Sequence, residues 1–234
     1  MPPPIKRTET GRAKLRRQRP PDQIAAIEPQ ALTIGKVIWE WNNLHADLFR
    51  ILWALVGDHG KRPRDFPTAL WYIAQSDDFQ RRLIEAIAGG LLHERPAELR
   101  HLRWLLKTIH QMSAYRNIAT HMYLEVYEGE SGYRGVALQI DGTKRAAALK
   151  HTLVGHKFTH FWDDFASDLY VLSQYALQLG FQLTGHPLAA QTPLPYRPRL
   201  KSPPAMREVN QLVDRLANRP RKRRPRRKAS AGKP

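Results

Sequence analysis

The spacing of apolar residues in three long segments is the feature that most constrains this chain. In residues 34–55, 99–112 and 158–179, apolar side chains recur at intervals of three and four residues. In an α-helix this spacing places them on one face, and such a face is stable only when it is buried against another element. Hydrophobic residues make up 42% of the 234 residues, which is enough to build a core. The sequence therefore predicts a mainly α-helical protein.

Local signals predict where the first helices begin and end. Thr33 suits the N-cap of the first helix, and Gly57 suits its end. A second helical region is expected from about Thr68 to Leu92. It should be interrupted at Ser76 to Asp78, where Asp77 and Gln80 have the spacing of a capping box. This region then contributes the second long helix.

Two more helices complete the expected bundle. Pro96 suits the first turn of a helix that runs to about Arg116, and the last long helix is expected from about Lys157. Four amphipathic helices with short connections favour an antiparallel four-helix-type bundle over residues 30–190. Alternating strand-forming residues predict a small β-hairpin insertion at about residues 122–140.

The ends of the chain differ from this folded part in charge. The net charge is +17, yet residues 21–196 hold 17 Lys and Arg against 18 Asp and Glu. We expect residues 1–29 and 219–234 to be disordered basic tails, and residues 191–218 to be a Pro-rich linker with a short amphipathic helix from Pro204 to Asn218. The C-terminal tail is the expected nucleic-acid contact. Its basic residues are Arg219, Arg221, Lys222, Arg223, Arg224, Arg226, Arg227 and Lys228.

Several classes of protein are excluded by what the sequence lacks. The longest apolar stretch, residues 34–56, carries seven polar or charged residues, so no membrane span or membrane partner is expected. No apolar run follows the first basic residues, and there is no cysteine, which together favour a cytoplasmic protein. Neither a Gly-rich phosphate loop nor a nucleophile elbow is present, so nucleotide hydrolysis and serine catalysis are not predicted.

The residues Arg116, Asn117 and His121 carry the main functional signal. An Arg-Asn pair followed by His after three residues, at the end of a predicted core helix, resembles the signature of the HEPN ribonucleases, a superfamily of small helical bundles. The resemblance covers this motif and, loosely, residues 31–185. It implies an endoribonuclease that is a homodimer, needs no metal or other cofactor, and leaves a 2′,3′-cyclic phosphate on the RNA.

The chemistry of these residues suits that reaction. When the 2′-hydroxyl of RNA attacks the neighbouring phosphate, one group must accept its proton and another must protonate the leaving oxygen. A histidine exchanges protons near neutral pH, and an arginine holds phosphate oxygens with a permanent charge. One motif histidine in each chain is too few for both proton transfers, so pairing of two chains would supply the second motif histidine. In the family, the Asn orients the histidine or the phosphate.

Further residues extend the resemblance. Tyr123 follows His121 by two positions, as in HEPN toxins whose tyrosine is adenylylated by a nucleotidyltransferase-type antitoxin. This match raises the prospect of a toxin or defence protein, although a tyrosine is equally ordinary in a strand. Asn43 and Asp47 are polar-support candidates on the first helix, where a solvated face is the simpler interpretation.

Two alternatives to this function remain at the level of the sequence. Arg116 and Asn117 also suit the C-terminal cap of a helix, in which case the protein is a non-catalytic nucleic-acid-binding or interaction module. The less favoured alternative is a metal-dependent hydrolase that uses His156, His160 and Asp164, which recur every four residues.

Overall fold

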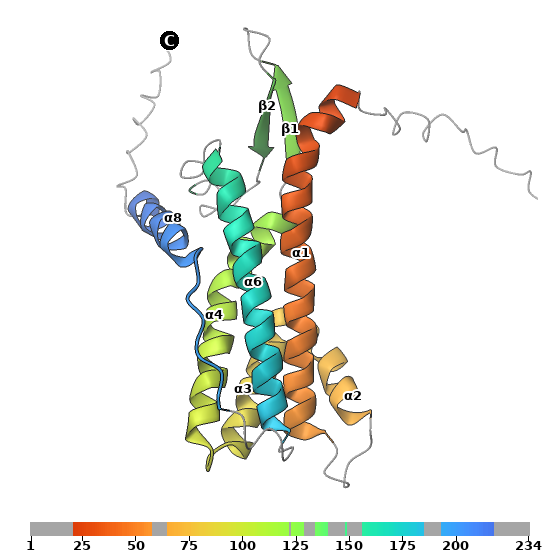
Figure 1. The fold of residues 1–234 in the computed structure, drawn as a ribbon, viewed down its shortest axis with the longest axis vertical. Helices are drawn as coiled ribbons and strands as arrows, with labels where there is room; N and C mark the ends of the chain where they lie inside the picture. The colour runs from red at the N-terminus through yellow and green to blue at the C-terminus, as the bar shows by residue number, and fades with distance from the viewer. Residues whose placement is uncertain are drawn as a thin grey trace, which may run out of the picture.

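The computed structural model describes residues 21–57, 65–121, 123–128, 134–139, 148, 156–184 and 193–217. Within these residues the fold is mainly helical, as predicted, with α1 (Pro21–Val56) and α6 (His156–Leu183) side by side at its centre (Figure 1). The predicted tail segments 1–20 and 219–234 lie outside the described residues. None of the described helices is both long enough and apolar enough to cross a membrane.

The central helices α1 and α6 run in the same direction. The Ser173 hydroxyl of α6 donates to the Asp47 carboxylate of α1. Farther along both helices, a Cβ on Gly180 would lie 3.4 Å from Ile51, so the two helices are close in this region. Contacts that advance together along both chains define parallel helices, and Figure 1 shows the same direction in the order of colours. The expected antiparallel arrangement is therefore wrong for this pair.

The helix α4 (Pro96–His121) runs antiparallel to the central helices α1 and α6 (Figure 1). Tyr115 near its end contacts Phe161 at the beginning of α6, whereas Arg95, next to its beginning, donates to the Gln182 carbonyl. The helix α3 (Asp77–Leu91) is also antiparallel to α4. The helices α1 and α3 run in the same direction. The short helix α2 (Phe66–Ile73) lies between them in the chain and packs beside α1, with Trp71 against Phe49.

The predicted beginning of the first helix is wrong. α1 begins at Pro21, so the expected tail does not extend to residue 29, and Thr33 is a helix-interior residue with only 5% of its surface exposed. Proline at the first position of a helix costs no hydrogen bond, which explains this beginning. Pro29 lies inside the helix, and Figure 1 shows the first turns of α1 bending away from the rest, as proline-containing helices do.

The N-cap of α3 is also shifted by one residue. Ser76, and not Asp77, is the cap, and its hydroxyl accepts a hydrogen bond of 3.2 Å from the Phe79 amide. Asp77 and Asp78 therefore occupy the first turn, where a negative charge is favoured by the helix dipole. The consequence is that the Asp77 carboxylate is available for contacts with other helices.

Two elements flank the bundle. The strands β1 (Tyr123–Glu128) and β2 (Arg134–Gln139) pair antiparallel, with Tyr123 opposite Gln139. The helix α8 (Pro203–Ala217) packs its buried Met206 and Val209 onto the core, and the Tyr115 hydroxyl donates to the Met206 carbonyl at 2.9 Å.

The segment before α8 is held by one buried carboxylate. Asp168 of α6 is 2% exposed and accepts hydrogen bonds from the backbone amides of Lys201 and Ser202 and from the Ser202 hydroxyl, at 2.6 to 3.0 Å. Hydrogen bonds to a buried charged acceptor are the stronger kind. Asp168 therefore fixes where α8 joins the bundle.

We predict that Asp168→Ala lowers the free energy of unfolding by about 2–4 kcal/mol, because three buried donors lose a charged acceptor. Urea denaturation followed by circular dichroism measures the loss. The matched control is Asp163→Ala, an exposed carboxylate on the same helix. Equal stability of the two variants would show that Asp168 does not hold this segment.

Candidate active site

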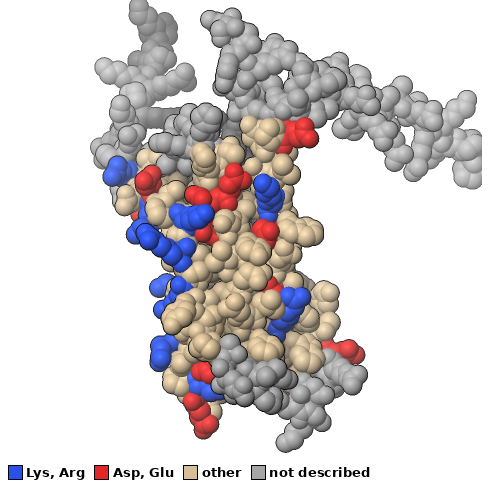
Figure 2. All heavy atoms as spheres, viewed as in Figure 1, with Lys and Arg blue, Asp and Glu red and all other residues tan. Residues whose placement is uncertain are grey.

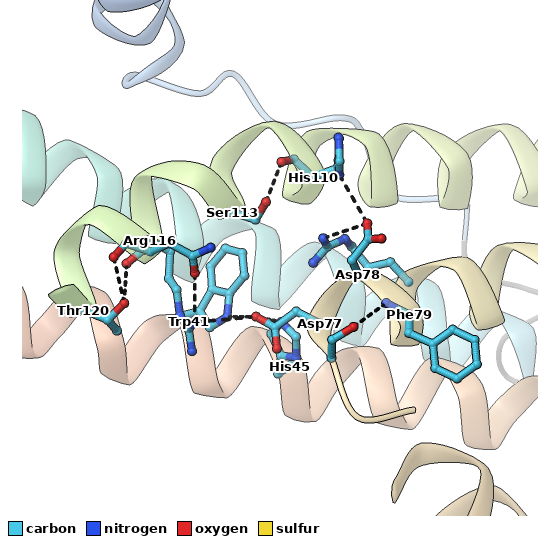
Figure 3. Close-up of polar contacts among 12 residues, drawn as sticks. Trp41, His45, Asp77, Asp78, Phe79, His110, Ser113, Arg116 and Thr120 are labelled. Atoms are coloured by element: carbon cyan, nitrogen blue, oxygen red, sulfur yellow. Dashed lines mark hydrogen bonds and ion pairs between the residues drawn. The ribbon is translucent and has the colours of Figure 1, made fainter. Parts of the chain in front are cut away.

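The predicted motif lies within α4 and not at its cap. The helix continues to His121, five residues beyond its expected end, so Arg116 and Asn117 are followed by another turn of helix. The interpretation of these two residues as a C-terminal cap is therefore wrong. A helical backbone also fixes the direction of the Arg116 side chain, which leaves α4 toward α1 and α3 (Figure 3).

The Arg116 guanidinium is held by three neighbours. Its Cζ lies 5.5 Å from the centre of the Trp41 ring, and its Nη1 lies 3.8 Å from Asp77 Oδ2. The same Nη1 donates to Asn117 Oδ1 at 3.1 Å, so Asn117 orients Arg116 from the next position of the helix. Arg116 Nε is buried and makes no hydrogen bond within the described part of the chain.

Asp77 joins these groups to α1. Trp41 Nε1 donates to Asp77 Oδ2 at 3.2 Å, and His45 Nε2 lies 3.7 Å from the same oxygen (Figure 3). Trp41 and His45 are four residues apart on α1, so they share a face, and their ring centres are 5.2 Å apart. Residues from three helices thus meet at one carboxylate.

The pKa of His45 is lowered, chiefly because burial disfavours the charged imidazole. Asp77 and a hydrogen bond with Gln80 act in the opposite direction, and the cations Arg81 and Arg116 lower the pKa further. His45 is therefore neutral at pH 7, the form in which an imidazole can accept a proton.

A cavity of about 420 Å³ opens over this cluster between α1, α2, α3 and α4. Arg116, His45 and Asp77 form part of its wall, and aromatic side chains form much of the remainder. The lining residues are Trp41, Asn42, His45, Ala46, Phe49, Thr68, Trp71, Tyr72, Asp77, Gln80 and Arg116. The cavity combines a cation, a carboxylate, a neutral imidazole and flat apolar surfaces.

The other motif residues lie outside this cavity lining. Asn117 and His121 are exposed on the last turns of α4. Tyr123 is the first residue of β1, and its side chain is outside the described part of the structure. Sequence reasoning thus selected Arg116, which the structure brings to the cavity, and His121, which it leaves on the adjoining surface.

Asn43 and Asp47 bind other partners. Asn43 Nδ2 donates to Glu40 Oε2 at 3.4 Å. Asp47 is 3% exposed and pairs with Ser173 and Arg50, so it is not on a solvated face. The contact between Asp47 and Ser173 joins α1 to α6, the others lie within α1, and none involves Arg116, Asn117 or His121.

The predicted metal candidates lie on the first turns of α6. His160 is exposed, Asp164 is partly exposed, and the His156 side chain lies outside the described residues. Among the side chains that the structure describes, no three His, Asp or Glu residues are grouped so that they could hold a metal ion. These positions therefore contribute nothing to the cavity site.

The sequence interpretation missed Trp41, His45 and Asp77 as site residues. Trp41 was assigned to the buried stripe of the first helix, and Asp77 was assigned to a helix cap. The one available signal was the spacing of Trp41 and His45 on a face that also carries polar Asn42, but this pattern is common in helices.

Exposed basic residues gather on the side formed by α4 and the segment before α8, at the left edge of Figure 2. Arg197 stacks over Trp104 with Cζ 5.6 Å from the ring centre, and its Nη2 donates to the Arg100 carbonyl at 3.3 Å. Arg199 and Lys201 follow it and are exposed. This side offers cations to a polyanion before the C-terminal tail begins.

Comparison with known proteins gives no assignment for this site. No family model matches the chain, and neither a curated protein nor a solved structure matches it. The site is therefore interpreted from its own residues and their chemistry.

We predict that folding stability falls as the pH is lowered below about 6.5, because the lowered pKa of folded His45 makes the unfolded histidine bind a proton more readily than the folded one. His101 acts in the same direction, because burial and the cations Arg197 and Arg100 lower its pKa. Melting temperatures measured by circular dichroism from pH 7.5 to 5 should fall less steeply for His45→Gln than for the unmodified protein.

His93→Gln is the control for this measurement, because His93 is exposed. Its pH dependence should match that of the unmodified protein. If the melting temperature of His45→Gln falls with pH as steeply as that of the unmodified protein, His45 is not a source of this pH dependence.

Proposed function

We propose that this protein is a metal-independent endoribonuclease of the HEPN type, which cleaves RNA by attack of the 2′-hydroxyl and leaves a 2′,3′-cyclic phosphate. The observation that carries the proposal is the position of Arg116, whose guanidinium lines an open cavity beside His45 and Asp77. A cation that served only to stabilise the fold would not need a cavity, a buried free N–H and a neutral imidazole around it.

Arg116 is proposed to bind the scissile phosphate. Its charge is partly balanced by Asp77, and its buried Nε is a donor without a partner in the described residues. A phosphate oxygen would accept from this donor and stabilise the charge that develops on phosphorus during cleavage. Asn117 holds the guanidinium in place through the bond to Nη1.

Proton transfer is proposed to use His121 and His45. His121 matches the catalytic histidine of the family motif and lies exposed at the end of α4, where a second chain could meet it. His45 supplies a neutral imidazole in the same cavity as Arg116. With His45 and His121, one chain offers two histidines for the two proton transfers, and the homodimer that would bring two motif segments together remains part of the proposal.

The proposed architecture is that of the family: a four-helix-type bundle with a β-hairpin insertion, paired through the motif segments. RNA is the proposed partner, and the basic side of α4 and the C-terminal tail would contact its backbone. Under this proposal the protein acts as a toxin or defence nuclease. Tyr123 would then be the residue that a nucleotidyltransferase-type antitoxin modifies.

We predict that Arg116→Ala and His121→Ala each reduce cleavage of a labelled single-stranded RNA by about 100-fold or more, because each removes a group needed in the transition state. Cleavage by the unmodified protein should persist in EDTA. Mass spectrometry of the products should show 2′,3′-cyclic phosphate ends.

Matched controls are Arg82→Ala and His93→Ala, which remove an exposed cation of α3 and an exposed histidine, both outside the cavity lining. Both should cleave at the unmodified rate, and all four variants should keep their helical circular dichroism spectra. RNA binding without cleavage by the unmodified protein would favour the non-catalytic binding module. Cleavage that is lost in EDTA would favour the metal-dependent alternative.

A further inference from the structure

We infer that the aromatic part of the cavity receives one unstacked nucleobase of the RNA, next to the phosphate held by Arg116. This inference deepens the proposed function by naming what the cavity recognises. It rests on the aromatic side chains, on the polar groups between them and on the limited positive charge of the site.

The aromatic side chains form a row from Arg116 to the rim of the cavity. Trp41 lies under the guanidinium, His45 stands 5.2 Å from Trp41, and Trp71 stands 6.2 Å from His45, measured between ring centres. Phe49 lies 5.5 Å from Trp71. Trp41 is 1% exposed and lies beneath the guanidinium, whereas Phe49 and Trp71 are partly exposed. Every base has a flat face, so these two rings offer stacking partners to any nucleotide.

Tyr72 adds an exposed ring at the rim. It is 77% exposed although it belongs to the cavity lining, and its neighbour Ile73 is 67% exposed. Within α2 these two residues present apolar surface that the described residues do not cover. A base that enters between Tyr72 and the row of rings would cover part of this surface.

Polar side chains stand among the rings. Asn42, Thr68 and Gln80 line the cavity and carry both hydrogen-bond donors and acceptors. Gln80 Nε2 donates to the backbone carbonyl of Trp71 at 3.4 Å, which ties the amide to the residue whose ring would stack on the base. Donors and acceptors together match the edge of a base, which presents both kinds of group.

The charge and size of the cavity distinguish a nucleotide from other ligands. Asp77 lies beside Arg116, so the site does not carry the excess of cations expected for a free polyanion. An apolar ligand would leave the buried donor Arg116 Nε without a hydrogen-bond partner. The volume of about 420 Å³ is within the range of small-molecule sites.

The test is isothermal titration calorimetry of the full-length chain with each of the four nucleoside 3′-monophosphates, with ribose 5-phosphate and inorganic phosphate as probes that lack a base. We expect the nucleotides to bind more tightly than both probes. Tyr72→Ala should raise the Kd of the nucleotides about fivefold or more and leave that of phosphate unchanged, because stacking on one ring is lost.

Tyr170→Ala is the matched control, since Tyr170 is an exposed tyrosine of α6 away from the cavity lining. It should bind nucleotides as the unmodified protein does. Equal Kd values for phosphate and nucleotides, or nucleotide binding insensitive to Tyr72→Ala, would overturn the inference. RNA cleavage without nucleotide binding would overturn this inference and leave the proposed function intact. Nucleotide binding without RNA cleavage would overturn the proposed function and leave a nucleotide site in the cavity.

Discussion

One carboxylate oxygen, Asp77 Oδ2, connects the helices around the cavity. Trp41 Nε1 donates to it from α1, His45 Nε2 lies near it on the same helix, and Arg116 approaches it from α4. The Arg116 guanidinium lies against Trp41 with its Nε buried, and Asp77 is the negative partner that balances its charge in this position. The cap of α3 by Ser76 is what leaves Asp77 free for this role.

In the proposed function, this arrangement separates phosphate binding at Arg116 from the exposed part of the motif. Arg116 is fixed inside by α1 and α3, whereas His121 lies on the last turn of α4. In the proposed function, a substrate phosphate at Arg116 would lie in the same cavity as His45, and His121 would act from the exposed end of α4. The helix α1, which forms one wall of the cavity, is joined to its parallel neighbour α6 through Asp47 and Ser173.

The helical character and the apolar faces were predictable, because spacing at intervals of three and four residues survives in any packed helix. The relative direction of α1 and α6 was not predictable. It depends on the short helix α2, which leads the chain back along α1 before α3 begins, and the periodicity of apolar residues does not encode this path. Arg116 was found from its motif. His45 and Asp77 were missed, because their role arises only when α1 and α3 meet, and Ser76 competes locally with Asp77 as a cap.

The central claim is that RNA enters the cavity over Asp77 and Arg116, and photo-crosslinking tests it most directly. RNA carrying 4-thiouridine would be irradiated with the full-length protein, and the crosslinked peptides would be mapped by mass spectrometry. The account predicts crosslinks in α2 at Trp71 or Tyr72 and in α1 between residues 41 and 49. Crosslinks confined to residues 197–234, with none in α1 or α2, would contradict it.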